Sequence, residues 1–154
     1  MIEINNESGV NVDEVRLREL GEFVLEELNI HPQAELSILL VDLDTMSAYH
    51  EKFLDLPGPT DVLSFPMDEL RIPGPGEAPP EGLLGDVVLA PEYVAKQAPT
   101  KGNTAAEEAD YLLVHGILHL LGFDHAEPED ERVMFALNDR LIADWKAKRA
   151  GEAR

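Results

Sequence analysis

The sequence predicts an α+β fold, in which a single four-stranded mixed sheet is packed by about five helices. Short runs of β-branched and aliphatic residues are interspersed with longer runs in which apolar residues recur at helical spacing. These runs are mixed without internal repeats, which favours one sheet covered by helices. The 154 residues and their 44% hydrophobic content suit one core, so we expect a single domain over 1–154.

The first part of the chain predicts a strand, a helix and a second strand. Ile2 and Ile4 alternate with polar neighbours, as in a short strand. Apolar residues within 13–28 recur every three or four positions, which predicts a helix. Residues 35–41 are apolar on both faces, which is typical of a central strand.

A helix, a strand and a long loop follow. Asp44 is suited to cap a helix that runs to about Phe53 and is stopped by the Pro-Gly-Pro at 57–59. Residues 61–65 are apolar on both faces and precede a proline, which favours a strand near the sheet edge or beside a cleft. Seven prolines and glycines within 68–82 exclude a packed element, so this segment is predicted to be a flexible loop.

The second half predicts one more strand and three helices. A strand over 83–90 precedes a short helix that begins at Pro91. Thr104-Ala-Ala-Glu107 is a capping-box pattern, and it begins a helix that ends at Leu121, before Gly122. The last helix should begin near Pro128 and leave a tail over 147–154. Its inward-facing residues are predicted to be Val133, Leu137, Leu141, Ile142 and Trp145.

The chain is strongly acidic, with 12 Lys and Arg residues against 31 Asp and Glu residues and a formal net charge of −19. This balance excludes binding of nucleic acid through overall charge, so any RNA must be held by a local patch. The chain has no cysteine, no apolar run long enough for a membrane span and no signal-peptide pattern at its start. We therefore expect a cytoplasmic protein without a membrane partner.

Three of the five histidines fall within eleven residues. His115 and His119 are four residues apart on the predicted helix, about 40° around its axis, so they face the same way. Gly122 permits the chain to reverse, which brings His125 back to the same point. This spacing predicts one transition-metal ion bound by His115, His119 and His125.

Three neutral imidazoles leave one position of a tetrahedral ion open, as in catalytic zinc sites. Zn²⁺ is therefore the predicted cofactor, while Ni²⁺ and other divalent ions also suit imidazole ligands. A bound ion would activate water near His115. The spacing is that of metzincin peptidases, but these carry a glutamate base where this chain has Gly116. Asp124 is the nearest carboxylate, and it could act as a base, cap the turn, or orient one of the histidines through a hydrogen bond.

The full pattern His-Gly-x-Leu-His-Leu-x-Gly-x-Asp-His over 115–125 resembles the signature of the YbeY family of bacterial metal-dependent endoribonucleases. The segments Pro-Thr-Asp-Val-Leu-Ser-Phe at 59–65 and Leu-Gly-Asp-Val at 84–87 are similar to two further family motifs, in the same order. The resemblance covers nearly the whole chain. It implies a zinc ion at the three histidines, cleavage of single-stranded RNA, maturation of the 3′ end of small-subunit ribosomal RNA, and a part in ribosome quality control.

Substrate contacts are predicted around the second motif. Thr60, Asp61 and Ser64 are placed to line a cleft, although the first two also suit turn chemistry. The family often carries Tyr-Arg shortly before this motif, and the resemblance implies that this arginine contacts phosphate. Here Phe53 and Leu54 stand in that stretch, which leaves Lys52 as the nearby cation. Other candidate cations, at the end of the last helix, are Lys146, Lys148 and Arg149.

Three functions fit these observations. The first is an endoribonuclease that acts on ribosomal RNA, with the small ribosomal subunit and ribosome-associated proteins as partners. The second is a zinc hydrolase of peptides or other small substrates, which Gly116 disfavours. The third is a non-catalytic ribosome-assembly factor, in which the metal holds the fold and acidic surfaces dock partners.

Overall fold

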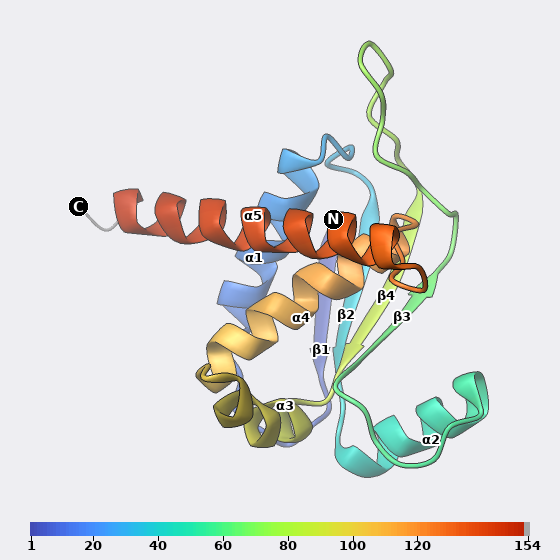
Figure 1. Ribbon diagram of the computed structural model, residues 1–154, viewed down its shortest axis with the longest axis vertical. Helices are drawn as coiled ribbons and strands as arrows, with labels where there is room; N and C mark the ends of the chain where they lie inside the picture. The colour runs from blue at the N-terminus through green and yellow to red at the C-terminus, as the bar shows by residue number, and fades with distance from the viewer. Residues whose placement is uncertain (153–154) are drawn as a thin grey trace.

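The structure, a computed structural model described over residues 1–152, has a mixed sheet in the predicted α+β arrangement (Figure 1). The strand order is β1-β2-β4-β3; β1, β2 and β4 run parallel, and β3 pairs antiparallel with β4. β3 is therefore an edge strand, as predicted. The strands are β1 (Ile2–Asn6), β2 (Glu35–Leu40), β3 (Val62–Pro66) and β4 (Leu83–Leu89).

Helices α1, α4 and α5 lie on one face of the sheet, and α2 lies toward the other face at the β3 side (Figure 1). Within the described residues, no helix is both long and apolar enough to cross a membrane. The α-helices are α1 (Glu14–Glu27), α2 (Leu43–Leu54), α3 (Pro91–Gln97), α4 (Ala105–Leu120) and α5 (Pro128–Glu152), and a 3₁₀ helix spans Ala98–Lys101.

The alternation of side chains along each strand gives the sheet two apolar faces. On β4, Val87 and Leu89 join the main core beneath α1 and α4, while Val88 points to the opposite face. There, Val88 packs with Leu63 of β3 and Met46 of α2 in a smaller cluster. The second cluster anchors α2 beside the edge strand, which matters for the site described below.

Helix α4 begins and ends as its sequence predicts. The Thr104 side chain accepts a hydrogen bond from the Glu107 N–H, and the Glu107 carboxylate accepts one from the Thr104 N–H, which completes a capping box. At the other end, the N–H groups of Gly122 and Phe123 bond to the carbonyls of His119 and Leu118. This is a Schellman turn, and Gly122 takes the positive φ of 95° that such a turn requires.

Three expectations about the other helices need correction. Asp42, not Asp44, caps α2, because the chain enters the helix directly after buried Val41; the Thr45 N–H donates to its Oδ1 at 2.8 Å. Val133 is 47% exposed, and the buried stripe of α5 instead runs through Met134, Asn138, Leu141 and Trp145.

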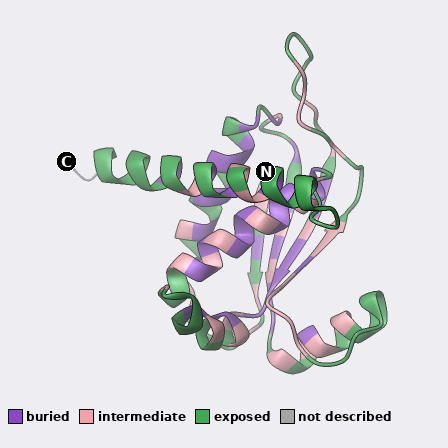
Figure 2. Cartoon of the chain, in the orientation of Figure 1, coloured by how far each residue is buried: buried purple, intermediate pink, exposed green. Residues whose placement is uncertain are grey.

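Because Asn138 is polar, the spacing of apolar residues in the sequence does not reveal this buried stripe. Most of α5 is solvent-exposed (Figure 2). The third correction concerns the tail expected over 147–154. Residues 147–152 are helical and continue α5, while 153–154 lie outside the described residues. Residues 67–82 contain no helix or strand, as predicted for the Pro- and Gly-rich segment.

The backbone of α4 approaches the sheet closely at Gly116. A Cβ at this position would lie 2.7 Å from Val87 Cγ1 and 3.2 Å from Ser64 Oγ, distances that real Cβ atoms avoid. The Ser64 hydroxyl also donates a hydrogen bond to the Gly116 carbonyl at 2.9 Å. This position therefore fixes α4 against β3 and β4.

Gly116→Ala should destabilise the protein by about 1–2 kcal/mol, because overpacking against branched, buried Val87 outweighs the higher helix propensity of alanine. Gly151→Ala in α5 is the matched control, since its Cβ would meet open space and should be neutral or slightly stabilising. Urea unfolding of both variants measures the difference. Equal stabilities for the two would contradict the close contact.

Candidate metal centre

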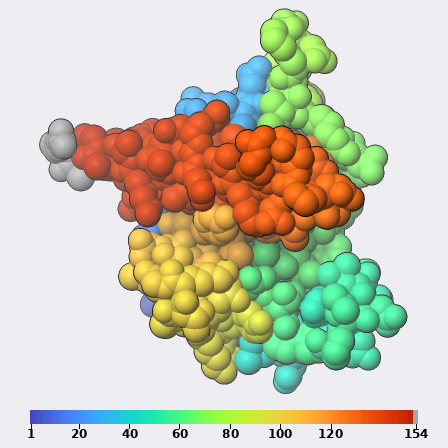
Figure 3. Space-filling view, in the orientation of Figure 1, coloured from blue at the N-terminus to red at the C-terminus, as the bar shows by residue number. Residues whose placement is uncertain are grey.

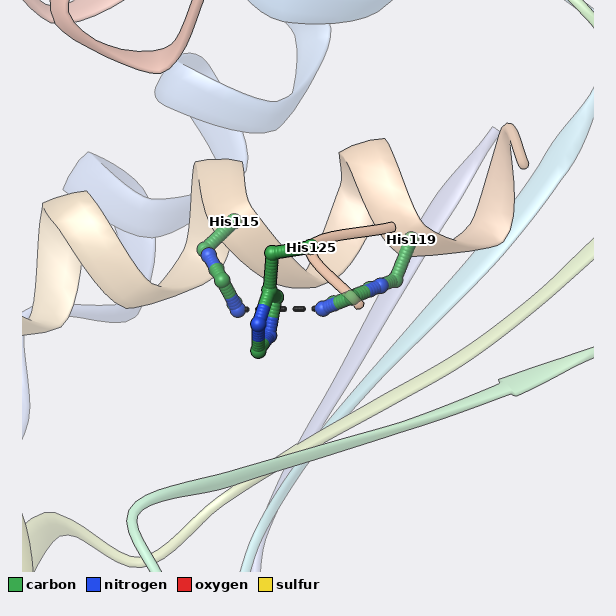
Figure 4. A group of neighbouring side chains, drawn as sticks. All are labelled: His115, His119 and His125. Carbon is green, nitrogen blue, oxygen red and sulfur yellow. Dashed lines mark hydrogen bonds between the residues drawn. The ribbon is translucent and has the colours of Figure 1, made fainter. Parts of the chain in front are cut away.

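The three histidines of the sequence motif converge at one point (Figure 4). His115 and His119 project from α4 toward each other, with 3.1 Å between their Nε2 atoms, and His125 reaches the same point from the turn after the helix. One ligand atom from each residue lies within 4.8 Å of the others. Two nitrogens bound to one tetrahedral Zn²⁺ are about 3.3 Å apart, so these donors fit one ion.

The turn between α4 and α5 positions His125. After Gly122 reverses the chain, the Asp124 carboxylate accepts a hydrogen bond from the Ala126 N–H at 2.6 Å. This local bond holds the backbone on both sides of His125 in a tight turn. Asp124 therefore stabilises the turn, as its position in the sequence suggested. Its role as a general base stays a prediction.

The backbone selects the ring atom that His119 offers. Its Nδ1–H donates to the Phe123 carbonyl at 2.9 Å, which leaves Nε2 unprotonated in the neutral ring and aimed at the other histidines. Such a bond to the second nitrogen orients metal-binding histidines and raises their basicity. The same turn thus ends the helix and orients one ligand.

Burial favours the neutral form of the two histidines on α4. Removal from water, together with repulsion by positive charge on His119 and His125, lowers the pKa of His115 from 6.5 to about 4. The pKa of His119 is also lowered by burial, against a bond to the Phe123 carbonyl that raises it. Neutral imidazole is the form that binds metal, so the helix side of the site is ready to bind at neutral pH.

An open cleft of about 540 Å³ leads from the histidines along β3. Thr60, Asp61 and Ser64 line it, and their contact with a substrate stays a prediction. Asp61 accepts hydrogen bonds from its neighbour, the Val62 N–H, and from Gln97 on α3, which fixes its carboxylate. In Figure 3 the green segment that contains β3 lies between α2 (teal) and the start of α5 (orange).

The predicted cations occupy two different places. Lys52 lies on α2, two residues from His50 and Leu54, which both line the cleft. The C-terminal cations serve the fold instead: Lys146 pairs with Glu107 at 3.6 Å, Lys148 lies over the Phe23 ring, and Arg149 over Trp145. These contacts explain Lys146, Lys148 and Arg149 as ordinary surface residues of the last helix.

Two site residues, His50 and Arg71, had no signal in the sequence. His50 lines the cleft, as does Phe65 of the 59–65 motif, and the His50 Nδ1–H donates to the Gly58 carbonyl at 2.9 Å. The guanidinium of Arg71, from the Pro- and Gly-rich segment, packs against Gly122 in the metal-site turn. Nothing in the neighbouring sequence places Arg71 beside a turn fifty residues further along the chain.

In metal-free protein, His115 should stay neutral between about pH 7.5 and about pH 5.5, whereas an unperturbed histidine titrates near pH 6.5. Because the unfolded chain binds this proton more readily, the stability that His115 contributes is complete above about pH 6.5. It is lost as the pH falls toward its folded pKa of about 4. NMR titration of the ring measures this directly. A midpoint near pH 6.5 for His115 would contradict it.

Comparison with known proteins places these features in a family. The sequence model described as Endoribonuclease YbeY matches residues 2–146. The chain is 63% identical over 145 residues to an Endoribonuclease YbeY of Cutibacterium acnes, covering 94% of each chain. It is 58% identical over 148 residues to the Endoribonuclease YbeY of Beutenbergia cavernae, covering 96% of this chain and 98% of that one.

A solved structure shares the fold. The solution structure of TM1509 from Thermotoga maritima aligns with a TM-score of 0.62 at 24% identity, covering 96% of this chain and 93% of that chain. At this identity the likeness supports the arrangement of sheet and helices alone. The family match over nearly the whole length, together with the two relatives, is decisive: this chain belongs to the YbeY endoribonuclease family.

Proposed function

We propose that this protein is a metal-dependent endoribonuclease that cleaves single-stranded RNA and matures the 3′ end of small-subunit ribosomal RNA. The observation that carries the proposal is the convergence of three histidine donors on the wall of an open cleft, in a chain of this family. We further propose Zn²⁺ as the ion. The small ribosomal subunit and its associated proteins, in the cytoplasm, are the proposed setting, with a part in late ribosome quality control.

We assign different roles to the residues that line the cleft. His115, His119 and His125 would hold the ion, which when bound polarises a phosphoryl oxygen and lowers the pKa of water. Thr60 and Asp61 present hydrogen-bonding groups along the path from the histidines. Ser64 also lines the cleft, and because its hydroxyl donates to the Gly116 carbonyl, its oxygen can still accept a hydrogen bond.

Asp124 is the proposed proton acceptor. Its Oδ1 is used by the turn, whereas its Oδ2 has no hydrogen-bond partner within residues 1–152. The carboxylate is exposed and adjoins His125 in sequence, so water can reach it. General bases need such access to the group they deprotonate.

Lys52 and Arg71 are the proposed phosphate contacts. Lys52 extends from the helix that forms one wall of the cleft, and Arg71 packs on the turn that carries His125. Within residues 1–152, neither cation forms a salt bridge with a carboxylate. Both charges are therefore available to a polyanion on an otherwise acidic protein.

A peptidase function is disfavoured by the packing at Gly116. A glutamate there would have to enter the space held by Val87 and the Ser64 hydroxyl. The general base of a metzincin-like site thus has no room in this fold. The reading as a non-catalytic assembly factor is separated from the proposal by experiment.

Removal of the metal by a chelator, or His115→Ala, should lower cleavage of a single-stranded ribosomal RNA fragment by at least about 100-fold, because one ligand or the ion itself is lost. Gel analysis of the fragment measures the rate, and circular dichroism should show a retained fold. His31→Ala, which alters a surface histidine paired with Glu81, is the matched control.

Two outcomes would overturn the proposed function. Equal cleavage by all samples would identify a contaminating nuclease. Unfolding on metal removal, with ribosome maturation rescued in cells by His115→Ala, would make the metal structural and the protein an assembly factor.

Lys52→Ala and Arg71→Ala should each weaken RNA binding several-fold and lower the slope of log affinity against log salt by about 0.7, the value for one contact to single-stranded phosphate. Lys148→Ala is the control for Lys52. Both lysines lie over a phenylalanine ring, at 5.2 Å for Lys52 and 5.5 Å for Lys148, but Lys148 is on the core helices. If the slope of log affinity against log salt is unchanged in Lys52→Ala and Arg71→Ala, neither residue contacts the RNA phosphates.

A further inference from the structure

We propose that Tyr49, Phe53 and Phe65, called the aromatic cluster below, form a stacking site for one unpaired nucleobase beside the metal centre. The proposal rests on the proposed function, because it takes RNA as the ligand of the cleft. It names the part of the site that recognises the base rather than the phosphate. Nothing in the three histidines supplies that recognition.

The rings are arranged in contact with one another. The Phe53 and Phe65 centroids are 5.1 Å apart, and Tyr49 lies 6.1 Å from Phe53 and 6.5 Å from Phe65, all edge-to-face. Tyr49 and Phe65 also pack on the smaller apolar cluster of the sheet, which limits their movement. Phe53 is the outer ring and is 52% exposed. A rigid base of two rings therefore supports a third that faces solvent.

The apolar surface of the described chain is concentrated at this point. Among its nine exposed large hydrophobic side chains, three fall within four residues at the end of α2 and the turn after it. These are Phe53, Leu54 and Leu56. Exposed apolar groups gathered in this way, rather than scattered singly, mark a binding surface.

The aromatic cluster is continuous with the metal cleft. Phe65 and Leu54 line the same cavity as His115, His119 and His125. A chain whose phosphate lies at the histidines would therefore carry an adjacent nucleotide along β3 toward Phe65 and Phe53. This continuity favours RNA as the occupant over an independent partner docked on α2.

Charge supports a stacking contribution in this protein. With a net charge of −19, the surface offers few of the phosphate contacts that dominate the affinity of most nucleic-acid-binding proteins. Stacking on aromatic rings is the main alternative, because every unpaired base presents a face. Lys52, 5.2 Å from the Phe53 ring centroid, adds a cation at the same place. A base held in a duplex cannot offer its face, so this site selects single strands.

The test pairs a protein variant with an RNA variant. Zinc-loaded protein is assayed with a single-stranded ribosomal RNA oligonucleotide and with versions that carry one abasic residue at successive positions near the cleavage point. One abasic position should raise KM for the unaltered protein by roughly 5- to 100-fold, with a smaller change in kcat. For Phe53→Ala, KM on the intact oligonucleotide should rise similarly, and the abasic penalty should disappear.

Two further variants separate stacking from structure. Phe53→Tyr keeps an aromatic face and should bind like the unaltered protein. Val15→Ala removes another exposed apolar side chain, on α1, and should leave both KM values unchanged. Phe53 is half-exposed, so Phe53→Ala should fold normally, as a thermal melt checks. An abasic penalty of equal size in Phe53→Ala and unaltered protein would overturn the stacking site, as would an unchanged KM for Phe53→Ala.

Direct binding of a fluorescently labelled oligonucleotide distinguishes the two proposals. If the protein binds RNA through Phe53 but does not cleave it, the stacking site stands and the catalytic proposal fails. If it cleaves RNA with no dependence on Phe53, the catalytic proposal stands and the stacking site fails. In that case, weaker binding of Phe53→Ala to the small subunit with unchanged affinity for free ribosomal RNA would reassign the cluster to a protein partner.

Discussion

The close contact of α4 with β3 and β4 at Gly116 is the constraint on which the rest of the molecule depends. It places His115, one residue earlier, at the edge of the sheet rather than over its middle. The same contact aligns Ser64 with the helix and makes β3 the floor of the cleft. A bulkier residue would lift the helix, and the histidines would then lose their relation to Thr60 and Asp61.

The site combines a neutral ligand set with a very acidic protein. Burial lowers the pKa of His115 and His119, so these two ligands add no positive charge of their own at neutral pH. An acidic surface attracts cations and repels RNA, which suits the first task of the site and opposes the second. Phe65 of the aromatic cluster lines the cleft, Lys52 lies over the neighbouring Phe53 ring, and Arg71 packs on the turn that carries His125. These groups can offset that repulsion locally.

The sequence predicted what local geometry determines. Helical spacing and the Gly122 turn were sufficient to place three histidines together, and the capping box at Thr104 was sufficient to begin α4. Prediction from the sequence failed where tertiary packing determines which residues are buried or capped. The polar Asn138 interrupts the apolar spacing of the buried face of α5, and Asp42 caps α2 because β2 ends at Leu40, two residues before it. His50 and Arg71 reach the site through contacts between distant segments, which leave no pattern in neighbouring residues.

All three proposed ligands come from one stretch of eleven residues, whereas the Ser64–Gly116 bond joins residues 52 apart in the chain. Closing a short loop costs little entropy, and closing a long one costs more. The three ligands are thus joined by contacts between residues close in sequence, whereas the cleft beside them is built from residues far apart in sequence. The metal donors can therefore form from local contacts alone, whereas the cleft needs the edge strand packed against α4.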